Sequence, residues 1–202
     1  YVEKTVIKRW NDQEDRFGLR SKTVTVQLLQ NGELYDKQNL TGQVDLSKEN
    51  NWTKTWSNLP KYRYFTESGN IVRELYKYEI KEVEFSNSDY YETLYQNSDT
   101  GNVTITTITN TLKTAKFRVA KSIDNYIDAT EQIVLKDLLD DEFIVKVEEQ
   151  VSPSESDKAF STGLVLKHAG TEERGIIRSR EVSGYIELPV TDSGTLYKVT
   201  EI

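Results

Sequence analysis

Short stretches in which apolar and polar residues alternate run through the whole sequence, and they constrain the fold more than any other feature. The clearest contain these apolar positions: Val24, Val26 and Leu28; Tyr76, Tyr78 and Ile80; Phe143, Val145 and Val147; Tyr197 and Val199. Successive side chains of a β-strand point to opposite faces, so this period is typical of strands buried on one face. The sequence therefore predicts an all-β protein of short antiparallel strands arranged as two sandwiches.

The connector between the two predicted domains lies near Thr111–Thr114. A predicted strand, Val103–Leu112, ends there, and a new alternating stretch over residues 117–123 follows almost at once. No low-complexity segment intervenes. We therefore expect one domain over residues 1–112 and a second over residues 113–202, joined by a connector short enough to restrict their swing.

Two local signals refine this expectation. Asn31-Gly32 follows the apolar pair Leu28-Leu29, and Asn-Gly is a strong signal for a two-residue hairpin turn. A short helix or turn is expected over Glu131–Leu139. Apart from that segment, helical periodicity is scarce, so helices contribute little to the predicted fold.

Composition excludes several classes of function. Of 202 residues, 36% are apolar and the net charge is −7, which is typical of a globular protein and argues against a nucleic-acid partner. No run of about 20 apolar residues exists to span a membrane. The chain has no cysteine and one histidine, so we expect no disulfide, no metal site and no cofactor. It starts at Tyr1 and lacks methionine, so we expect a fragment of a longer protein.

Three polar residues, Lys8, Glu82 and Asn110, are predicted to share a strand face with apolar neighbours. Those neighbours are, in chain order, Val2, Val6 and Trp10, then Tyr76, Tyr78 and Ile80, then Ile108 and Leu112. Burying a lysine, a glutamate or an asparagine alone would cost several kcal/mol. The three residues are therefore expected to be partners.

The residues alone leave two interpretations of this trio open. One is a buried Lys8–Glu82 salt bridge whose hydrogen bonds are completed by Asn110. The other is chemical: burial deprotonates the lysine to a nucleophilic amine and keeps the glutamate protonated as an acid. The acid would polarise the asparagine carboxamide and pass protons to departing ammonia. Folding holds the groups together, and the product is an amide between two side chains.

The chain from Lys8 to Leu112 resembles the B-type repeat of the staphylococcal collagen adhesin, the Cna B domain of Gram-positive adhesins and pilins. The resemblance rests on motifs that occur in this order: Lys8-Arg9-Trp10-Asn11-Asp12 with Gly18 and Arg20, Val24-Thr25-Val26-Gln27-Leu28-Leu29 with Asn31-Gly32, Asn51-Trp52, Asn58-Leu59-Pro60-Lys61-Tyr62, Tyr78-Glu79-Ile80-Lys81-Glu82, and Ile108-Thr109-Asn110-Thr111. Ser21 stands where the family commonly has proline, a departure that touches a turn and not the chemistry.

The resemblance implies immunoglobulin-like sandwiches with reversed strand topology and an intramolecular isopeptide bond. It assigns the nucleophile to Lys8, the acceptor to Asn110 and the catalytic acid to Glu82. The chain would then be no enzyme in the ordinary sense, because its crosslinking reaction turns over once. The resemblance thus favours the chemical interpretation of the trio.

The second domain resembles pilin isopeptide-linkage domains less closely. Lys121 lies between apolar neighbours where such domains carry their reactive lysine, and Tyr197–Glu201 resembles the segment that ends at Glu82. Lys121 and Glu201 are therefore candidate second-domain equivalents of Lys8 and Glu82, both expected on inward faces. An ordinary partner pair or solvated ends remain the alternative. Since no asparagine follows at a plausible strand position, we expect this domain to lack its last strand, an isopeptide bond and a closed sheet edge.

Two weaker signals have simple interpretations. The acidic runs Asp12–Asp15 and Asp140–Glu142 lack the regular ligand spacing of a calcium loop, so they are expected to be solvated turns. Trp52 and Trp56 are aromatic enough for a sugar platform, but the resemblance places them in a core strand and its continuation. Neither signal changes the expected function.

The sequence predicts a structural stalk or shaft module of a cell-wall-anchored pilin or adhesin, located outside a Gram-positive cell. Expected partners are other pilus subunits or peptidoglycan, reached through regions beyond this fragment, and no membrane or nucleic acid. The alternative is an adhesive module that itself binds a host matrix protein or glycan. A large exposed apolar or aromatic groove would favour that alternative, and a smooth polar surface would favour the stalk.

Overall fold

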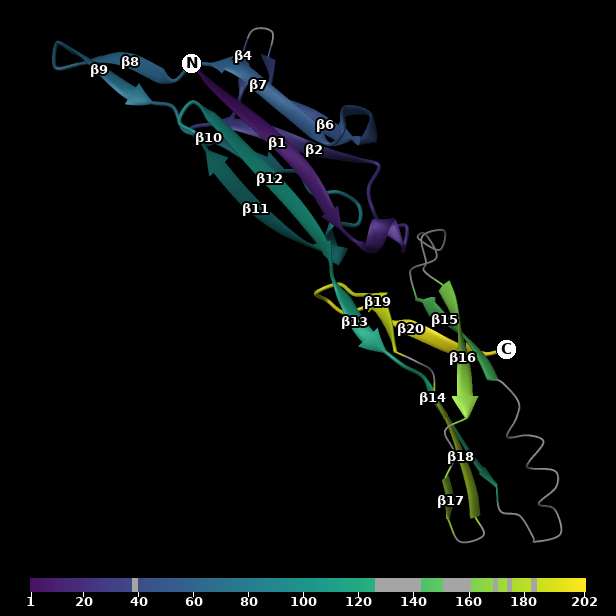
Figure 1. The fold of residues 1–202 in the computed structure, drawn as a ribbon. Coiled ribbons are helices and arrows are strands. Elements are labelled where there is room, and N and C mark those ends of the chain that lie inside the picture. Colours follow the sequence, from purple (N-terminus) through teal and green to yellow (C-terminus); the bar gives the residue numbers. More distant parts are fainter. Residues whose placement is uncertain (38–39, 126–142, 151–160, 169–170, 174–175, 183–184) are drawn as a thin grey trace. The chain divides into compact units, whose positions relative to one another are not determined.

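The computed structural model describes residues 1–37, 40–125, 143–150, 161–168, 171–173, 176–182 and 185–202. The chain divides into two compact units, Tyr1–Leu112 and Lys113–Ile202. Strands dominate both units in the described residues (Figure 1). The predicted all-β, immunoglobulin-like class is confirmed. The short helix or turn expected over Glu131–Leu139 lies outside the described residues.

The first unit contains two four-stranded sheets. In the first, the strand order is β11 (Tyr91–Asp99), β12 (Val103–Leu112), β1 (Val2–Asn11) and β7 (Thr53–Leu59). In the second, β2 (Thr23–Gln30) pairs with β10 (Tyr78–Glu82), β3 (Glu33–Leu34) and β6 (Gln43–Ser47). Smaller two-stranded sheets pair β4 (Asp36–Lys37) with β5 (Leu40–Thr41) and β8 (Tyr62–Glu67) with β9 (Asn70–Leu75). Three short 3-10 turns, Gln13–Asp15, Lys48–Asn50 and Ser88–Tyr90, connect strands.

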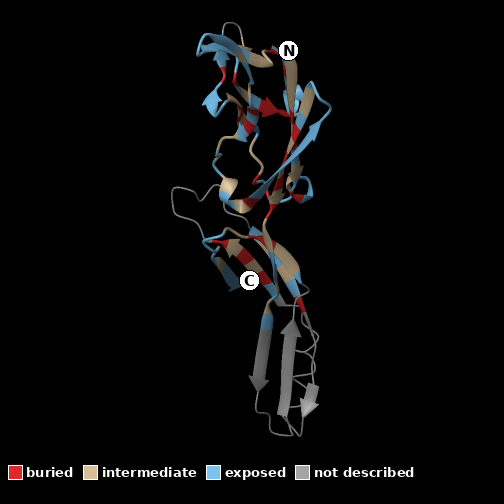
Figure 2. Ribbon diagram, turned by 90° about the vertical axis from the view of Figure 1, so that its left-hand side faces the viewer, coloured by how far each residue is buried: buried red, intermediate tan, exposed pale blue. Residues whose placement is uncertain are grey.

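The core of the first unit lies between the inward faces of these sheets. Buried residues alternate with more accessible ones along β2 and β12, as the sequence pattern predicts (Figure 2). The core residues are Val6, Val24, Val26, Leu28, Tyr35, Leu46, Trp56, Leu59, Tyr78, Ile80 and Ile108. Burial of this apolar surface is the main force that holds the two sheets together.

The parallel pairing of β1 with β12 distinguishes this sandwich from a simple antiparallel meander. Glu3 pairs with Val103 and Asn11 with Thr111, so the two strands run side by side along their whole lengths (Figure 1). Parallel neighbours need a long crossover, and here almost the whole unit forms it. The strand that opens the unit and the strand that closes it are therefore direct neighbours.

The predicted Asn31-Gly32 hairpin is confirmed. Asn31 and Gly32 both have positive φ angles, +54° and +87°. Gln30 pairs with Glu33 across the turn, which leaves a two-residue loop. Two consecutive positive φ angles are what a type I′ turn requires, and Asn-Gly meets that requirement at little steric cost.

The second unit is also built from strands. Its larger sheet has the order β14 (Ala120–Asn125), β18 (Ile176–Val182), β16 (Ser161–His168), β15 (Phe143–Glu149) and β20 (Tyr197–Glu201), with β17 (Thr171–Glu173) beside β18. The short strands β13 (Thr114–Phe117) and β19 (Ile186–Pro189) form a separate pair. The alternating stretch expected over residues 117–123 is thus divided between β13 and β14. That this unit is a pilin-like domain lacking its last strand stays a prediction.

Gly42 provides a test of the packing around the second sheet. Its carbonyl accepts a hydrogen bond from the Leu28 amide (2.7 Å), and a Cβ added to it would lie 2.0 Å from the Tyr35 carbonyl oxygen. We predict that Gly42→Ala lowers the free energy of unfolding by about 1–3 kcal/mol, because backbone must shift to relieve the overlap. Denaturant unfolding measures the change.

Gly163→Ala is the matched control. A Cβ at Gly163, in β16, meets no atom within 4 Å, so its effect should stay within about 0.5 kcal/mol. If both variants lowered the free energy of unfolding equally, the close contact at Gly42 would not explain its effect.

Candidate functional site

The parallel register of β1 and β12 brings Lys8 and Asn110 onto one face of the first sheet. Lys8 pairs with Ile108, and Asn110 pairs with Trp10, so Lys8 and Asn110 are diagonal neighbours two residues out of register. Side chains at such diagonal positions lie within reach of long residues. Both side chains enter the core, because Lys8 is 3% exposed and Asn110 is fully buried.

Glu82 approaches the same point from the opposite sheet. It ends β10, and its backbone amide donates a hydrogen bond of 3.0 Å to the Tyr95 hydroxyl. Its carboxylate Oε1 accepts a 2.8 Å hydrogen bond from Asn110 Nδ2, and its Oε2 lies 3.4 Å from Lys8 Nζ. The structure therefore brings together the three residues that the sequence predicts as partners.

Burial changes the acid–base properties of Lys8. Removal from water disfavours the ammonium and lowers the lysine pKa from 10.5 to about 8, although the nearby Glu82 carboxylate acts in the opposite direction. The Nζ also donates a 3.2 Å hydrogen bond to the Arg9 carbonyl. A substantial fraction of Lys8 is therefore the neutral, nucleophilic amine at mildly alkaline pH.

Two oxygen atoms of the trio lack a hydrogen bond within the described part of the chain. They are Asn110 Oδ1 and Glu82 Oε2, and both are buried. Glu82 Oε2 still forms an ion pair with Lys8 Nζ at 3.4 Å, so Asn110 Oδ1 is the oxygen of the trio with neither kind of partner in the described chain. A buried acceptor without a donor costs about 1–3 kcal/mol. The non-covalent arrangement is therefore incompletely satisfied.

The contact between Glu82 and Asn110 differs from the expected one. The acid was expected to polarise the asparagine carbonyl, whereas the structure joins Glu82 to the amide nitrogen. An ionised carboxylate only accepts hydrogen bonds, so it must face the NH₂ side of the carboxamide. Contact with the carbonyl oxygen needs a protonated glutamate and a turned amide.

Aromatic rings enclose the lysine end of the site. Lys8 Nζ lies 4.2 Å from the ring centre of Trp10, whose ring makes edge contacts with Trp52, Phe85 and Tyr91 at centroid distances of 5.2–5.7 Å. The sequence pattern placed Trp10 on the apolar face but gave no sign that its ring covers the amine. This cluster keeps water from Lys8 and so supports the lowered pKa.

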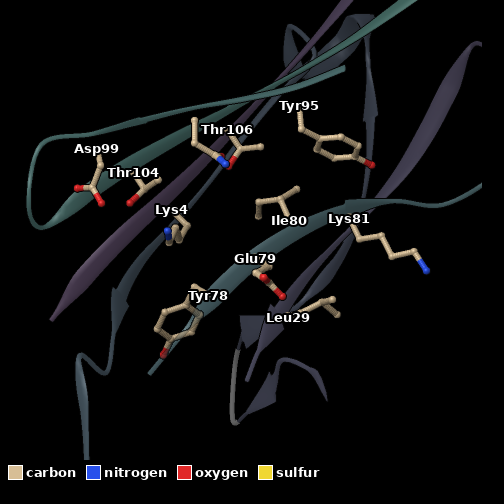
Figure 3. Close-up of a pocket in the computed structure, with 11 residues that line it drawn as sticks. Lys4, Leu29, Tyr78, Glu79, Ile80, Lys81, Tyr95, Asp99, Thr104 and Thr106 are labelled. Atoms are coloured by element: carbon tan, nitrogen blue, oxygen red, sulfur yellow. The ribbon is translucent and has the colours of Figure 1, made fainter. Parts of the chain in front are cut away.

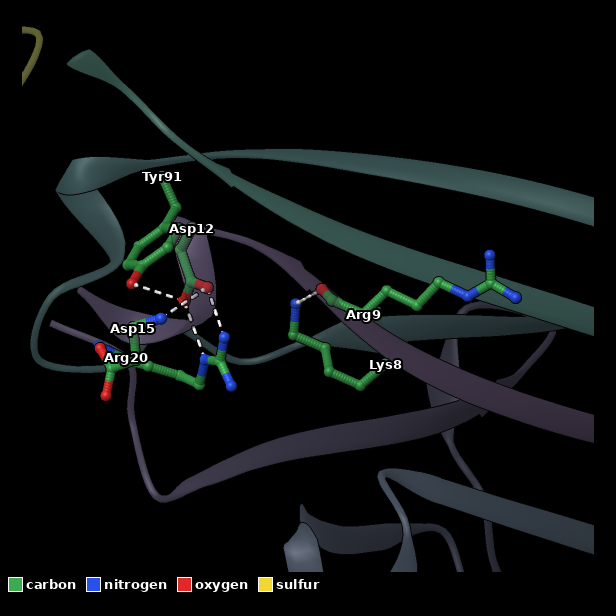
Figure 4. A network of polar contacts seen from close by, with 6 residues as sticks. All are labelled: Lys8, Arg9, Asp12, Asp15, Arg20 and Tyr91. Atoms are coloured by element: carbon green, nitrogen blue, oxygen red, sulfur yellow. Dashed lines mark hydrogen bonds and ion pairs between the residues drawn. The ribbon is translucent and has the colours of Figure 1, made fainter. Parts of the chain in front are cut away.

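A second polar network fixes the turn that follows β1 (Figure 4). The Arg20 guanidinium binds both oxygens of buried Asp12, with Nε 2.8 Å from Oδ2. The Arg20 and Asp15 backbone amides donate to the Asp15 and Asp12 carboxylates. Burial acts to raise the Asp12 pKa, but the hydrogen bonds from Arg20 and Asp15 outweigh it and hold the pKa below its usual range. Asp12 is therefore a structural anchor for the turn.

The structure does not bring Lys121 and Glu201 together. Lys121 lies on β14 and pairs with Glu181, whereas Glu201 lies on β20 and pairs with Val145. Strands β14 and β20 stand at opposite ends of the sheet order, with three strands between them. Glu201 is exposed, which differs from the inward orientation expected for it, because an edge strand has a solvated side. Their role in a second crosslink stays a prediction.

The remaining candidate signals of the sequence give no binding site in the described residues. Trp56 is fully buried, and its indole nitrogen donates to the Thr41 carbonyl, so it offers no sugar platform. Trp52 is half-buried against Trp10. No group of three potential metal ligands forms among the described residues, and none of their helices is long and apolar enough to cross a membrane. The run Asp140–Glu142 lies outside the described residues.

Comparison with known proteins gives matches of two kinds. The family model of the Cna protein B-type domain matches residues 4–111, a little over half of the chain. The collagen adhesin of Staphylococcus aureus is 32% identical over 102 residues, which make up 50% of this chain and 7% of that protein. The chain thus spans a small part of the curated relative it matches.

The chain is also similar to solved structures. Two B repeat units of the S. aureus collagen-binding protein match with a TM-score of 0.45 and 23% identity, covering 98% of this chain and 44% of that one. The pilus adhesin SpaC of Lactobacillus rhamnosus GG matches with a TM-score of 0.39 and 12% identity, covering 100% and 24%. The family-model match over residues 4–111, together with the motif residues Lys8, Glu82 and Asn110 in one buried cluster, shows that this chain belongs to the Cna B-type domain family.

Proposed function

We propose that the chain is a structural stalk module of a Gram-positive surface adhesin or pilin, whose first unit closes itself with a Lys8–Asn110 isopeptide bond. The observation that carries this proposal is the buried contact of one amine, one carboxyl group and one carboxamide. Glu82 lies 3.4 Å from the amine and 2.8 Å from the amide nitrogen. The module works outside the cell and has no turnover activity.

The reaction that fits these groups is a transamidation, in which the Lys8 amine replaces ammonia on the Asn110 carboxamide. The neutral Lys8 Nζ attacks the side-chain carbonyl carbon of Asn110, and the bond from that carbon to Nδ2 breaks. Nδ2 leaves as ammonia after gaining the proton that Nζ loses. Glu82 touches both nitrogens and can carry that proton between them. Because the fold holds all three groups in contact, no external catalyst is required.

A simple buried salt bridge is the competing interpretation of the same contacts. It explains the Lys8–Glu82 pair but leaves Asn110 Oδ1 and Glu82 Oε2 buried without hydrogen bonds. With a pKa of about 8, Lys8 keeps most of its charge near neutral pH, and the neutral amine gains as the pH rises. The covalent interpretation gives a role to the neutral form of Lys8, which attacks, and to the Asn110 carboxamide, which is attacked.

The position of the bond suits a protein that is pulled from its ends. Force entering before β1 reaches Lys8, crosses to Asn110 on the neighbouring strand, and leaves through the end of β12. The intervening chain, about 100 residues, is bypassed, and closing a loop of that length with a disulfide stabilises by roughly 4–5 kcal/mol. Lacking cysteine, the module would keep this crosslink in any redox state.

A direct binding role is the second candidate, favoured by one exposed surface. The β8–β9 hairpin exposes Tyr64 (65%), Ile71 (80%) and Leu75 (59%), which the register places on one face. If this face binds a host matrix protein, replacing Tyr64 and Ile71 by serine should lower attachment to matrix-coated surfaces without changing the ammonia loss. Unchanged attachment would exclude binding by this face, and the stalk role would be the only remaining candidate.

We predict that Glu82→Ala gives a folded protein that lacks the crosslink, because the proton carrier is gone. Its intact mass should equal the mass calculated from its sequence, whereas the wild-type mass should be lower by one ammonia. The variant should also melt earlier and be cut faster by protease.

Lys8→Ala and Asn110→Ala serve as matched controls, since each removes a bond partner. Each should also have an intact mass equal to the mass calculated from its sequence. Full ammonia loss in the Glu82→Ala protein would refute the catalytic role of Glu82.

We also predict that crosslinking accelerates with pH. Protein synthesised in mildly acidic buffer is transferred to buffers of increasing pH. Its rate of ammonia loss should rise about tenfold for each pH unit until the pH reaches the Lys8 pKa of about 8. The rate rises with pH because only the neutral amine attacks. The fraction of neutral amine rises steeply below the pKa and levels off above it. Mass spectra collected over time measure the rate, and a rate that is flat or falls with pH would contradict the role of Lys8.

A further inference from the structure

A pocket of about 540 Å³ opens between the two sheets of the first unit, away from the Lys8 site. We call it the Lys4 pocket, and it is lined by Lys4, Ile80, Tyr95, Asp99 and Thr106 among others (Figure 3). Neither Lys8, Glu82 nor Asn110 lines it. Its volume lies within the range of about 300–1,000 Å³ that is usual for ligand sites.

One wall of the pocket is the free edge of β10, which pairs on its other side with β2. The Asn31 amide donates to the Lys77 carbonyl, and the Val83 amide donates to the Thr25 carbonyl. In an antiparallel ladder the hydrogen-bonded pairs alternate along the strand. The backbone N–H and C=O groups of the odd-numbered residues of β10 therefore bond to β2. Those of the even-numbered residues point away from β2.

The backbone groups of Tyr78 and Ile80 consequently face the pocket side of β10. The Glu82 amide confirms this direction, because it donates to the hydroxyl of Tyr95 on β11. No backbone partner on that side is found for Tyr78 or Ile80 among the residues the structure describes. The two residues are only 8% and 9% exposed, so these unpaired groups lie in a recess.

The Lys4 side chain brings a positive charge into the same recess. It is half-buried, and within the described chain its Nζ makes neither a hydrogen bond nor an ion pair. Asp99 is the acid whose charge acts on Lys4, but its carboxylate accepts a 2.7 Å hydrogen bond from the Gly101 amide and forms no ion pair with Lys4. A half-buried ammonium without a direct partner loses part of its hydration, and a ligand carboxylate would offset that loss.

We propose that the Lys4 pocket binds an extended strand of a partner polypeptide, which pairs its backbone with Tyr78 and Ile80 and sets a carboxylate side chain against Lys4. Strand addition at a free sheet edge is a common mode of peptide recognition, in which backbone bonds give affinity and side-chain pockets give specificity. This site is independent of the isopeptide bond.

The recess decides what kind of partner fits. Two copies of this chain cannot pair β10 with β10, because that edge is recessed in both copies. A single extended segment with both edges free can enter between β10 and β11. The occupant is therefore a flexible or terminal segment of another protein, with an acidic residue among alternating β-formers.

A pair of synthetic peptides tests the proposal on the intact protein. The first is acetyl-TVTETVT-amide, and the second replaces its glutamate by glutamine. In amide-resolved NMR titrations the glutamate peptide should shift the Tyr78 and Ile80 amides and slow their hydrogen exchange. It should bind about ten times more tightly than the glutamine peptide, the effect of one charge-assisted hydrogen bond.

Two variants complete the test. Lys4→Met should weaken the glutamate peptide about tenfold and leave the glutamine peptide unchanged. Lys77→Met should change neither, because Lys77 is an exposed lysine outside the pocket lining. Failure of both peptides to bind, shifts confined to other strands, or equal affinity of the two peptides for the wild-type protein would overturn the proposal. So would Ile80 shifts that appear with protein concentration alone, which would indicate a second copy.

Discussion

The contact of Lys8 with Glu82 inside the core is the constraint on which the rest of the first unit depends. An amine and a carboxyl group lie 3.4 Å apart where only 3% of the lysine residue is exposed. Neither group would be tolerated there alone, because an unpaired buried charge costs several kcal/mol. The aromatic ring of Trp10 on one side and the Asn110 amide on the other complete the enclosure. The proposed chemistry and the stability of this site thus depend on the same few atoms.

The chain topology makes this contact possible. Parallel pairing of β1 with β12 places the beginning and the end of the unit side by side, and β10 brings Glu82 from the facing sheet. The Asp12–Arg20 anchor holds the turn directly after the lysine strand. Applied force and the proposed crosslink would therefore share one path, which explains why a stalk module would benefit from a bond at this register rather than elsewhere in the sheet.

Strand alternation was sufficient to predict which residues face inward, because side-chain direction in a strand has a strict period of two. It placed Lys8, Glu82 and Asn110 in the core, and the Asn31-Gly32 turn followed from local backbone preference alone. The family resemblance supplied the pairing of distant strands. Contacts set by three-dimensional packing stayed beyond reach: the Trp10 ring over the amine, the amide side of Asn110 facing Glu82, and the separation of Lys121 from Glu201. No periodic signal encodes such contacts between strands.

The proposed crosslink is a covalent bond between the side chains of Lys8 and Asn110. Electron density from crystals of this protein, at a resolution that separates bonded from non-bonded atoms, measures it most directly. We predict continuous density between Lys8 Nζ and the Asn110 side-chain carbonyl carbon, at the amide bond length of about 1.33 Å, with Glu82 in hydrogen-bond contact. Separate side chains at a non-bonded distance, with the asparagine carboxamide intact, would contradict the account.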